Sequence, residues 1–425
     1  MQNAILLHNL HWKKKYFKIP IKRDLLDKLL MFQDTKEIQI ITGIRRSGKS
    51  SLLKLYINEL IKTEDPKSIL FINFDDPNFS EIYQNPEKIY TIVETAEKLT
   101  QTKVKYLFLD EIQSVSAWEK YIKSVYDAEL FKKICITGSN SELLLSDYSK
   151  LLSGRYIVSK LYPLSLKEVL QYYKLTDNLS ILENKPHVLN ILEGCLKYGC
   201  FPEIVLKSNR QIKHELLANY YDSILIKDCV LNKNLREYKT FKELAFYVFN
   251  NLAALFSYNS ISKATAINDV SVKEYINAMQ DAFMIYEITQ FSFKIKTQLR
   301  SKRKLYTIDN GLVTATSLNF SENKGKLFEN MVFSEIIKSG YEEVFLFNDT
   351  KECDFIVKKG NNYAAIQASY EINAVNRERE LSALLFVKKK LKIDQLFIVT
   401  LSQEEELKEG VKIIPVYELR KRLVS

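Results

Sequence analysis

Apolar and polar positions alternate in a regular order over the first 140 residues. Apolar runs with the length of buried strands occupy residues 38–42, 69–74, 106–109 and 134–137. Segments with helical spacing lie around them, over residues 23–33, 49–62, 86–100 and 118–128. Strands that alternate with helices predict a parallel sheet of the α/β class. We therefore expect an α/β domain over residues 1–162.

The pattern changes after residue 162. Residues 163–240 are predicted to be helical. Residues 241–322 give a short helix, a longer helix over 271–283 and two strands around a basic segment, an order typical of a winged helix. Residues 323–425 predict a small α/β domain. Its expected elements are helices over 327–339 and 377–391 and strands over 343–347, 355–358, 363–367 and, as the last strand, 396–400.

A glycine-containing loop follows the first predicted strand. Residues 43–50 fit the pattern G-x-x-x-x-G-K-[ST], in which backbone N–H groups and a helix N-terminus surround phosphate oxygens. The predicted nucleotide-binding residues are Gly43, Arg46, Ser47, Gly48, Lys49, Ser50 and Ser51. We expect Lys49 to reach the β- and γ-phosphates and the Ser50 hydroxyl to bind Mg²⁺. A plain strand–turn–helix is the structural alternative.

Two carboxylates end the third predicted strand. Asp110 is expected to hold Mg²⁺, and Glu111 to polarise the attacking water. The fourth strand ends near Ser139 and Asn140, either of which could sense the γ-phosphate. Arg155 could act on a neighbouring subunit's nucleotide, which would require a homo-oligomer; an intramolecular salt bridge is the alternative.

Composition narrows the compartment and the class of partner. No apolar run approaches the length of a membrane span, and residues 1–15 lack the order of a signal peptide. The five cysteines are scattered, which argues against a zinc site and for a reducing compartment, so we expect a cytoplasmic protein without a membrane partner. The net charge of +10 is compatible with a polyanionic partner.

Basic residues cluster between residues 290 and 305, where no acidic residue occurs. They are Lys294, Lys296, Arg300, Lys302, Arg303 and Lys304. Phe291, Phe293 and Ile295 alternate with lysines, as in a hairpin with one solvated face. Such a wing would contact DNA phosphates, with little base readout from the helix over 271–283. A solvated hairpin or a surface that docks another protein is the alternative.

Short motifs along nearly the whole chain resemble a known family. They lie at residues 7–12, 22–24, 42–50, 72–77, 109–113 with Trp118, 137–141, 153–155, 199–203, 306–311 and 413–417. Together they resemble the archaeal and bacterial AAA+-like ATPases that join an ATPase module to a C-terminal domain of unknown function. The resemblance implies a winged-helix insertion and a C-terminal fold similar to PD-(D/E)xK nucleases.

The nuclease-like pattern is incomplete in this chain. Glu329 on a helix and Asp354 on a strand match the expected acids. Gln367 and Ser369 stand where the pattern has an acid and a lysine. The chain therefore lacks one carboxylate that would bind the metal ion and the lysine that would help to orient water. We expect an inactive nuclease-like scaffold.

Three functional hypotheses remain, all with ATP and Mg²⁺ as cofactors. The first is an ATPase that acts on or at nucleic acid. The second is an ATP-driven signalling or scaffold switch with a protein partner. The third is an active ATP-dependent DNA nuclease.

Overall fold

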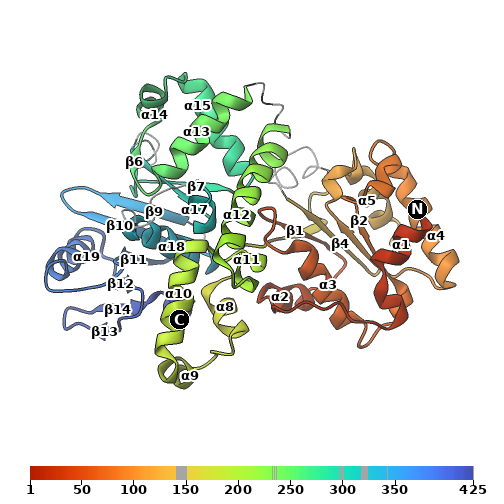
Figure 1. The fold of residues 1–425 in the computed structure, drawn as a ribbon, viewed down its shortest axis with the longest axis horizontal. Coiled ribbons are helices and arrows are strands. Elements are labelled where there is room, and N and C mark those ends of the chain that lie inside the picture. Colours follow the sequence, from red (N-terminus) through yellow and green to blue (C-terminus); the bar gives the residue numbers. More distant parts are fainter. Residues whose placement is uncertain are drawn as a thin grey trace. The chain divides into compact units, whose positions relative to one another are not determined.

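The structure is a computed structural model that describes residues 1–139, 151–231, 233, 235, 237–294, 296, 298, 301–316, 324–341 and 343–424. The chain divides into two compact units, Met1–Tyr162 and Pro163–Ser425 (Figure 1). Among the described helices, none combines the length and apolar character needed to cross a membrane.

The first unit is built on a parallel sheet with the strand order β2-β3-β4-β1-β5. Its strands are β1 (Ile38–Thr42), β2 (Ile69–Asn73), β3 (Tyr106–Asp110), β4 (Lys133–Gly138) and β5 (Tyr156–Lys160). The predicted α/β sheet is therefore present. The sequence pattern missed β5, an edge strand whose first three residues are only half buried and which gives no fully apolar run.

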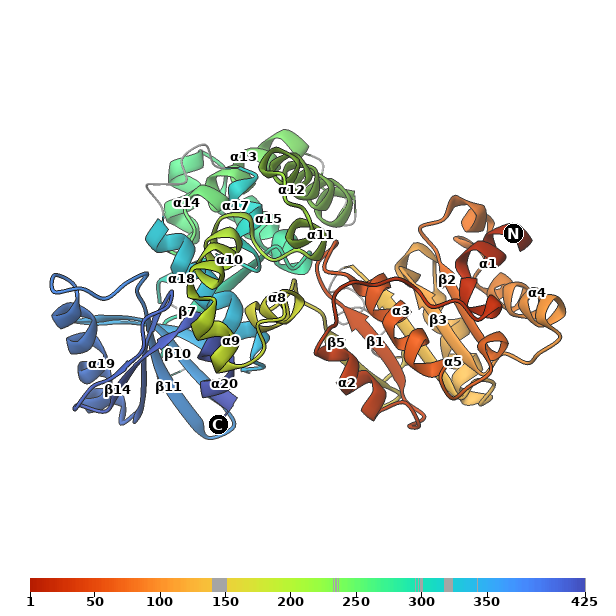
Figure 2. The ribbon, with the colours of Figure 1, turned by 60° about the horizontal axis from the view of Figure 1, so that its bottom comes forward.

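Helices cover both faces of this sheet, as Figure 2 shows. They are α1 (Gln2–His8), α2 (Leu25–Met31), α3 (Lys49–Leu60), α4 (Ile89–Thr100) and α5 (Trp118–Asp127), with short 3-10 turns between them. Alternate strand residues enter different cores. Ile40 packs with α1, α4 and α5, whereas Ile41 packs with α2 and α3. Burial on both faces explains why the central strands consist mainly of apolar residues.

The second unit begins with helices and a small antiparallel sheet. The helices are α8 (Leu166–Tyr172), α9 (Asn178–Glu183), α10 (Lys185–Tyr198), α11 (Pro202–Leu206), α12 (Arg210–Ile224), α13 (Tyr238–Asn250), α14 (Tyr258–Thr265) and α15 (Asp269–Asp281), with a π-helical segment at Leu225–Leu231. The sheet has the order β6-β8-β7 and consists of β6 (Leu255–Phe256), β7 (Ile285–Thr289) and β8 (Arg303–Thr307). Short α17 (Asn310–Thr314) follows.

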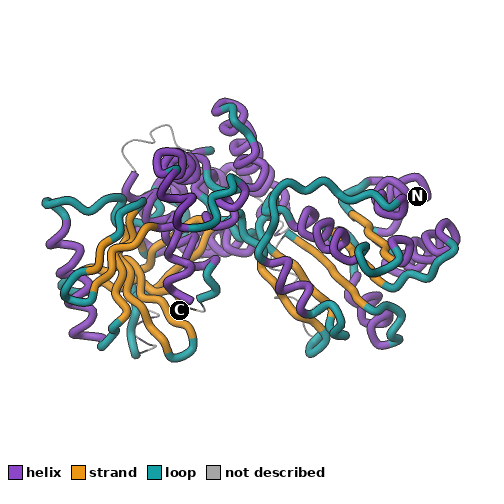
Figure 3. The backbone as a smooth tube through the Cα atoms, turned by 90° about the horizontal axis from the view of Figure 1, so that it is seen from below, coloured by secondary structure: helices purple, strands orange, loops and turns teal. Residues whose placement is uncertain are grey.

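A six-stranded mixed sheet completes the second unit, with the order β13-β14-β12-β11-β10-β9 (Figure 3). Its elements are α18 (Lys324–Lys338), β9 (Glu343–Asn348), β10 (Glu352–Lys359), β11 (Asn362–Ala368), α19 (Arg377–Leu391), β12 (Gln395–Thr400), β13 (Glu405–Glu406), β14 (Val411–Pro415) and α20 (Leu419–Val424). The prediction that residues 396–400 form the last strand was wrong. β14 pairs in parallel with β12 and buries Val411 and Ile413, but a charged loop separates the two strands in sequence.

Strands β7 and β8 form the predicted antiparallel pair around the basic segment, but the described residues between 291 and 296 do not form the predicted alternating strand. Strand β7 ends at Thr289, and no described residue between 291 and 302 belongs to a strand. The Phe291 ring packs against Phe345 and Tyr363 of the six-stranded sheet. Phe293 is 76% exposed. Tertiary packing of Phe291, rather than an alternating pleat, therefore sets the course of this segment.

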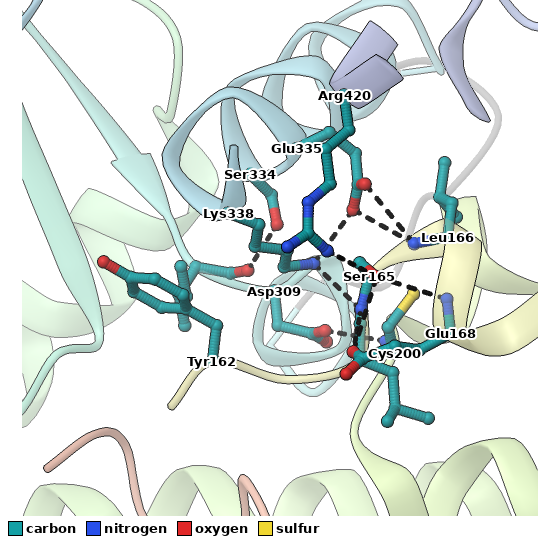
Figure 4. A network of polar contacts seen from close by, with 12 residues as sticks. Tyr162, Ser165, Leu166, Glu168, Cys200, Asp309, Ser334, Glu335, Lys338 and Arg420 are labelled. Carbon is teal, nitrogen blue, oxygen red and sulfur yellow. Dashed lines mark hydrogen bonds and ion pairs between the residues drawn. The ribbon is translucent and has the colours of Figure 1, made fainter. Parts of the chain in front are cut away.

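A buried polar network joins helix α18 to the segment that leads into α8 (Figure 4). The Lys338 ammonium donates to the Leu164 carbonyl at 3.0 Å and to Glu335 at 3.1 Å. Glu335 accepts the Leu166 N–H at 3.3 Å. Burial acts to lower the pKa of Lys338, but Glu335 and other nearby groups outweigh it and the pKa is raised. Lys338 is therefore a buried cation with matched partners.

Candidate functional site

The glycine-containing loop lies between β1 and α3 and has a backbone that demands glycine. Gly43 has φ +150°, and a Cβ atom there would lie 2.0 Å from the Leu161 carbonyl oxygen. Gly48 caps α3 with φ +97°, and Arg46 also has a positive φ, of +69°. The loop therefore curls tightly enough to direct N–H groups at an anion beside the N-terminus of α3.

Arg23 supports this loop from the preceding segment. Its guanidinium donates to the Ser47 carbonyl at 2.8 Å and to the Tyr162 carbonyl at 2.7 Å, and it is 7% exposed. Arg23 was not predicted as a site residue. Its only signal was its place in the motif at residues 22–24, because the bond to Ser47 spans 24 positions and is not visible in local spacing.

The two acids lie at the carboxyl end of the sheet. Asp110 is the last residue of β3, and Glu111 follows with a positive φ of +53°. Thr137, on the neighbouring strand β4, donates its hydroxyl to Asp110 Oδ1 at 2.5 Å and accepts the Glu111 N–H at 3.0 Å. A non-glycine residue held at positive φ costs energy, so these contacts maintain a strained geometry at the candidate site. Thr137 was not predicted as a site residue.

Lys49 and Glu111 face each other across the site. The Lys49 ammonium lies 3.6 Å from Glu111 Oε1 and donates to the Gly43 carbonyl at 3.0 Å. Glu111 also accepts a short hydrogen bond from the Gln113 amide. Burial acts to raise the pKa of Glu111, but Lys49, Gln113 and Arg45 outweigh it and lower the pKa. Glu111 is therefore held as a carboxylate.

Asp110 has the opposite tendency. Burial and the charge of Glu111 raise the pKa of Asp110 to about 6, despite hydrogen bonds from Ser50 and Thr137. The contact with Ser50 joins the two side chains predicted to hold Mg²⁺. A cation between them would relieve the buried negative charge.

The residues fit a nucleotide with Mg²⁺. Ser47 Oγ is buried and has no hydrogen-bond partner among the described residues, within a loop of curled backbone. Ser50 and Asp110 are oxygen donors of the kind that Mg²⁺ prefers. The chemistry of this donor set is that of a phosphate site next to a cation site.

Ser139, Asn140 and Arg155 are the other residues predicted to take part in catalysis. Ser139 is buried and hydrogen-bonds to Glu111, but Asn140 lies outside the described residues. Arg155 forms an ion pair with Asp127 at 3.0 Å and lies over the Tyr126 ring at 5.9 Å. The intramolecular alternative for Arg155 is therefore the arrangement present.

Only some of the basic residues predicted to contact nucleic acid are exposed. Lys294, Lys296 and Lys302 are exposed. Arg300 lies outside the described residues. Arg303 pairs with Glu287 at 2.7 Å.

The prediction that Lys304 contacts nucleic acid was wrong. Lys304 is only 4% exposed, and its ammonium forms an ion pair with Glu329 at 2.9 Å. Arg303 and Lys304 therefore do not belong to the predicted phosphate-binding surface. Their charges are already matched inside the second unit.

Three residues of the incomplete nuclease-like pattern line one cavity of the second unit. Glu329 from α18, Asp354 from β10 and Gln367 from β11 line it. Asp354 Oδ2 accepts the Ala368 N–H at 2.9 Å, and Gln367 Oε1 accepts the Asp354 N–H at 3.2 Å. The three residues are thus close in space although 38 positions separate the first from the last.

Comparison with known families agrees with this geometry. Residues 35–170 match the family described as "AAA domain", residues 190–324 match "Domain of unknown function (DUF8612)", and residues 324–419 match "Domain of unknown function (DUF4143)". The first unit therefore contains a P-loop ATPase-like α/β domain that is similar to AAA domains, in agreement with its glycine loop and paired acids.

Curated relatives extend over almost the whole chain. "Uncharacterized protein MJ1544" from Methanocaldococcus jannaschii is 33% identical over 96% of this chain and 90% of its own length. The chain belongs to the same protein family as MJ1544. An uncharacterized protein from Haemophilus influenzae is 29% identical over 93% of this chain and 97% of its own length.

Among solved structures, the ORC1 protein of Aeropyrum pernix in complex with DNA is similar over 73% of this chain and 94% of that chain. The identity is 12% and the TM-score 0.32, too low to carry a functional conclusion.

Proposed function

We propose that this protein is a Mg²⁺-dependent ATPase that acts on or at nucleic acid. The observation that carries the ATPase assignment is the convergence of Lys49, Asp110 and Glu111 at the carboxyl end of one parallel sheet. In open α/β sheets, ligands bind at this edge.

Each residue has a distinct task in the proposed reaction. The loop N–H groups and the Lys49 ammonium bind the phosphates, while Ser50 and Asp110 hold Mg²⁺, which neutralises charge on the β- and γ-phosphates when bound. Glu111 orients the attacking water and accepts its proton, because its lowered pKa keeps it ionised. Ser139, hydrogen-bonded to Glu111, helps to fix the water.

The proposed nucleic-acid contact rests on the exposed lysines 294, 296 and 302 and on the net charge of +10. Phe293 lies among these lysines with most of its ring exposed, an arrangement that suits a base stacked beside a neutralised phosphate backbone. The proposed winged-helix and nuclease-like domains, over residues 241–322 and 323–425, would then bind nucleic acid on the second unit.

A protein-docking switch is the second candidate. It is favoured by the internal pairing of Arg303 and Lys304, which leaves a smaller basic surface than the sequence predicts. An exposed phenylalanine such as Phe293 also suits a protein interface.

The deciding experiment measures steady-state ATP hydrolysis with Mg²⁺, with and without single- and double-stranded DNA. Wild type is compared with Lys49→Ala, with Glu111→Gln and with the triple change Lys294→Ala, Lys296→Ala and Lys302→Ala. We expect both single variants to lose turnover, Glu111→Gln while still binding ATP, and the triple variant to lose only DNA stimulation. Full turnover in Lys49→Ala would refute the site. Turnover that ignores DNA in wild type would favour the switch.

A further inference from the structure

The carboxylate cavity of the second unit contains an unusual central cation. The cavity has a volume of about 630 Å³, and α18, β8, β10, β11 and α19 contribute to its lining. Its acids are Glu329, Glu352, Asp354 and Glu380. The cation is Lys304, which comes from β8 of the separate three-stranded sheet.

The Lys304 ammonium sits among three of these acids. Nζ lies 2.9 Å from Glu329 Oε1, 2.9 Å from Glu352 Oε1 and 3.9 Å from Asp354 Oδ1. Its side chain is 5% exposed. Burial acts to lower the pKa of Lys304, but the carboxylates outweigh it and raise the pKa, so the ammonium stays charged. Removing this ammonium would leave the acids in the cavity without a cation, and breaking a buried ion pair in this way is strongly destabilising.

The acids are not arranged as a divalent metal site. Mg²⁺ needs oxygen ligands at about 2.0–2.1 Å in near-octahedral geometry. Glu329 Oε1 already accepts from Lys304 and, at 2.6 Å, from the Tyr306 hydroxyl. The Gln367 and Asp354 oxygens accept backbone N–H groups. Within the described part of the chain, no group of three His, Cys, Asp or Glu residues could hold a metal ion.

We propose that the Lys304 ammonium takes the place of a divalent metal ion in this cavity, so that the cavity of the wild-type protein binds no metal ion. The ammonium offsets one negative charge among Glu329, Glu352 and Asp354, and it ties β8 to the six-stranded sheet. Burial and the charge of Glu329 raise the pKa of Asp354, which reduces the negative charge that remains. Removing Lys304 would release Glu329 Oε1 and Glu352 Oε1 to rearrange around a metal ion, which the acids do not hold as they now lie. On this basis the protein carries out no Mg²⁺- or Mn²⁺-dependent cleavage at the cavity, whatever the ATPase domain does.

Mn²⁺ binding to the full-length protein without nucleotide tests the proposal. We would count bound Mn²⁺ by electron paramagnetic resonance in wild type, Lys304→Met, Asp354→Asn and the double variant. We expect wild type and Asp354→Asn to bind equally, Lys304→Met to gain one site, and the double variant to lose it. Lys326→Met is the matched control, because Lys326 lines the same cavity but is exposed. It should gain nothing.

Two results would overturn the proposal. One is a wild-type Mn²⁺ site that Asp354→Asn removes, which would mean that the cavity binds metal with Lys304 in place. The other is a folded Lys304→Met variant that gains no site. If Lys304→Met does not fold, the comparison of wild type with Asp354→Asn still decides the question. The ATPase assignment is tested separately, because neither variant lies in the first unit.

Discussion

The Thr137 hydroxyl lies 2.5 Å from Asp110 Oδ1 and donates a hydrogen bond to it. Thr137 belongs to β4, the strand between the loop strand β1 and the acid strand β3. Because the same hydroxyl accepts the Glu111 N–H, one side chain orients both acids. Losing a positioning contact of this kind typically costs about 10- to 100-fold in metal affinity or activity.

Thr137→Ala should therefore lower ATP turnover by about 10- to 100-fold, because Asp110 and Glu111 lose their shared partner. Thr137→Ser keeps the hydroxyl and should retain most of the activity. Steady-state ATP hydrolysis at saturating Mg²⁺ measures the effect. Equal activity in Thr137→Ala and wild type would remove Thr137 from the site.

Asp110→Asn should make the nucleotide-free protein more stable at about pH 8. The pKa of Asp110 is raised from 3.8 to about 6, so ionising it opposes folding by up to about 3 kcal/mol. This penalty is complete above the folded-state pKa and disappears as the pH falls toward the unfolded-state value. The stability gain of Asp110→Asn over wild type should thus shrink below about pH 6. Urea unfolding across this pH range measures it, and a gain that grows on acidification would contradict the assignment.

Gly43→Ala should destabilise the first unit by about 3 kcal/mol and abolish ATP binding, because its Cβ would meet the Leu161 carbonyl and its φ is positive. Gly194→Ala is a matched control within α10, where a Cβ finds open space. Alanine should stabilise that helix by up to about 1 kcal/mol. Thermal unfolding and nucleotide titration distinguish the two, and a stable, ATP-binding Gly43→Ala variant would show that the loop tolerates a side chain.

Arg155→Ala tests whether Arg155 acts as an arginine finger or only forms an intramolecular ion pair. An arginine finger would cost about 10³-fold or more in turnover. Because Arg155 pairs with Asp127 at a partly exposed position, we expect turnover within about threefold of wild type. Asp127→Asn is the control and should behave like Arg155→Ala. A large loss in Arg155→Ala alone, together with ATP-dependent oligomers by light scattering, would restore the finger in trans.

Lys338→Met should destabilise the second unit by about 3–5 kcal/mol, because it leaves Glu335 charged and buried without its cation. Adding Glu335→Gln should recover part of the loss. The exposed pair Lys358–Glu343, at 2.7 Å, supplies a control, and Lys358→Met should cost less than about 1 kcal/mol. Chemical unfolding compares these variants; similar costs at the two sites would mean that burial of the Lys338 network contributes little.

Much of the candidate ATP site could be predicted from the sequence. Lys49 and Ser50 follow a glycine loop of fixed spacing, and Asp110 and Glu111 end an apolar strand, so local pattern places them correctly on their elements. Parallel strands bring such ends to one edge. By contrast, Arg23 and Thr137 act through bonds to distant positions, and neither residue type has a local pattern that indicates its role.

The basic segment shows the limit of sequence reasoning most clearly. Lys302 and Lys304 are indistinguishable in sequence, being two lysines in one charged run. In the structure Lys302 is exposed, whereas Lys304 is buried among acids from α18 and β10. The sequence by itself determined the α/β domain and its glycine loop, since those depend on local periodicity and spacing. Only the tertiary structure decided which charges face solvent, because burial and pairing depend on residues brought together from distant parts of the chain.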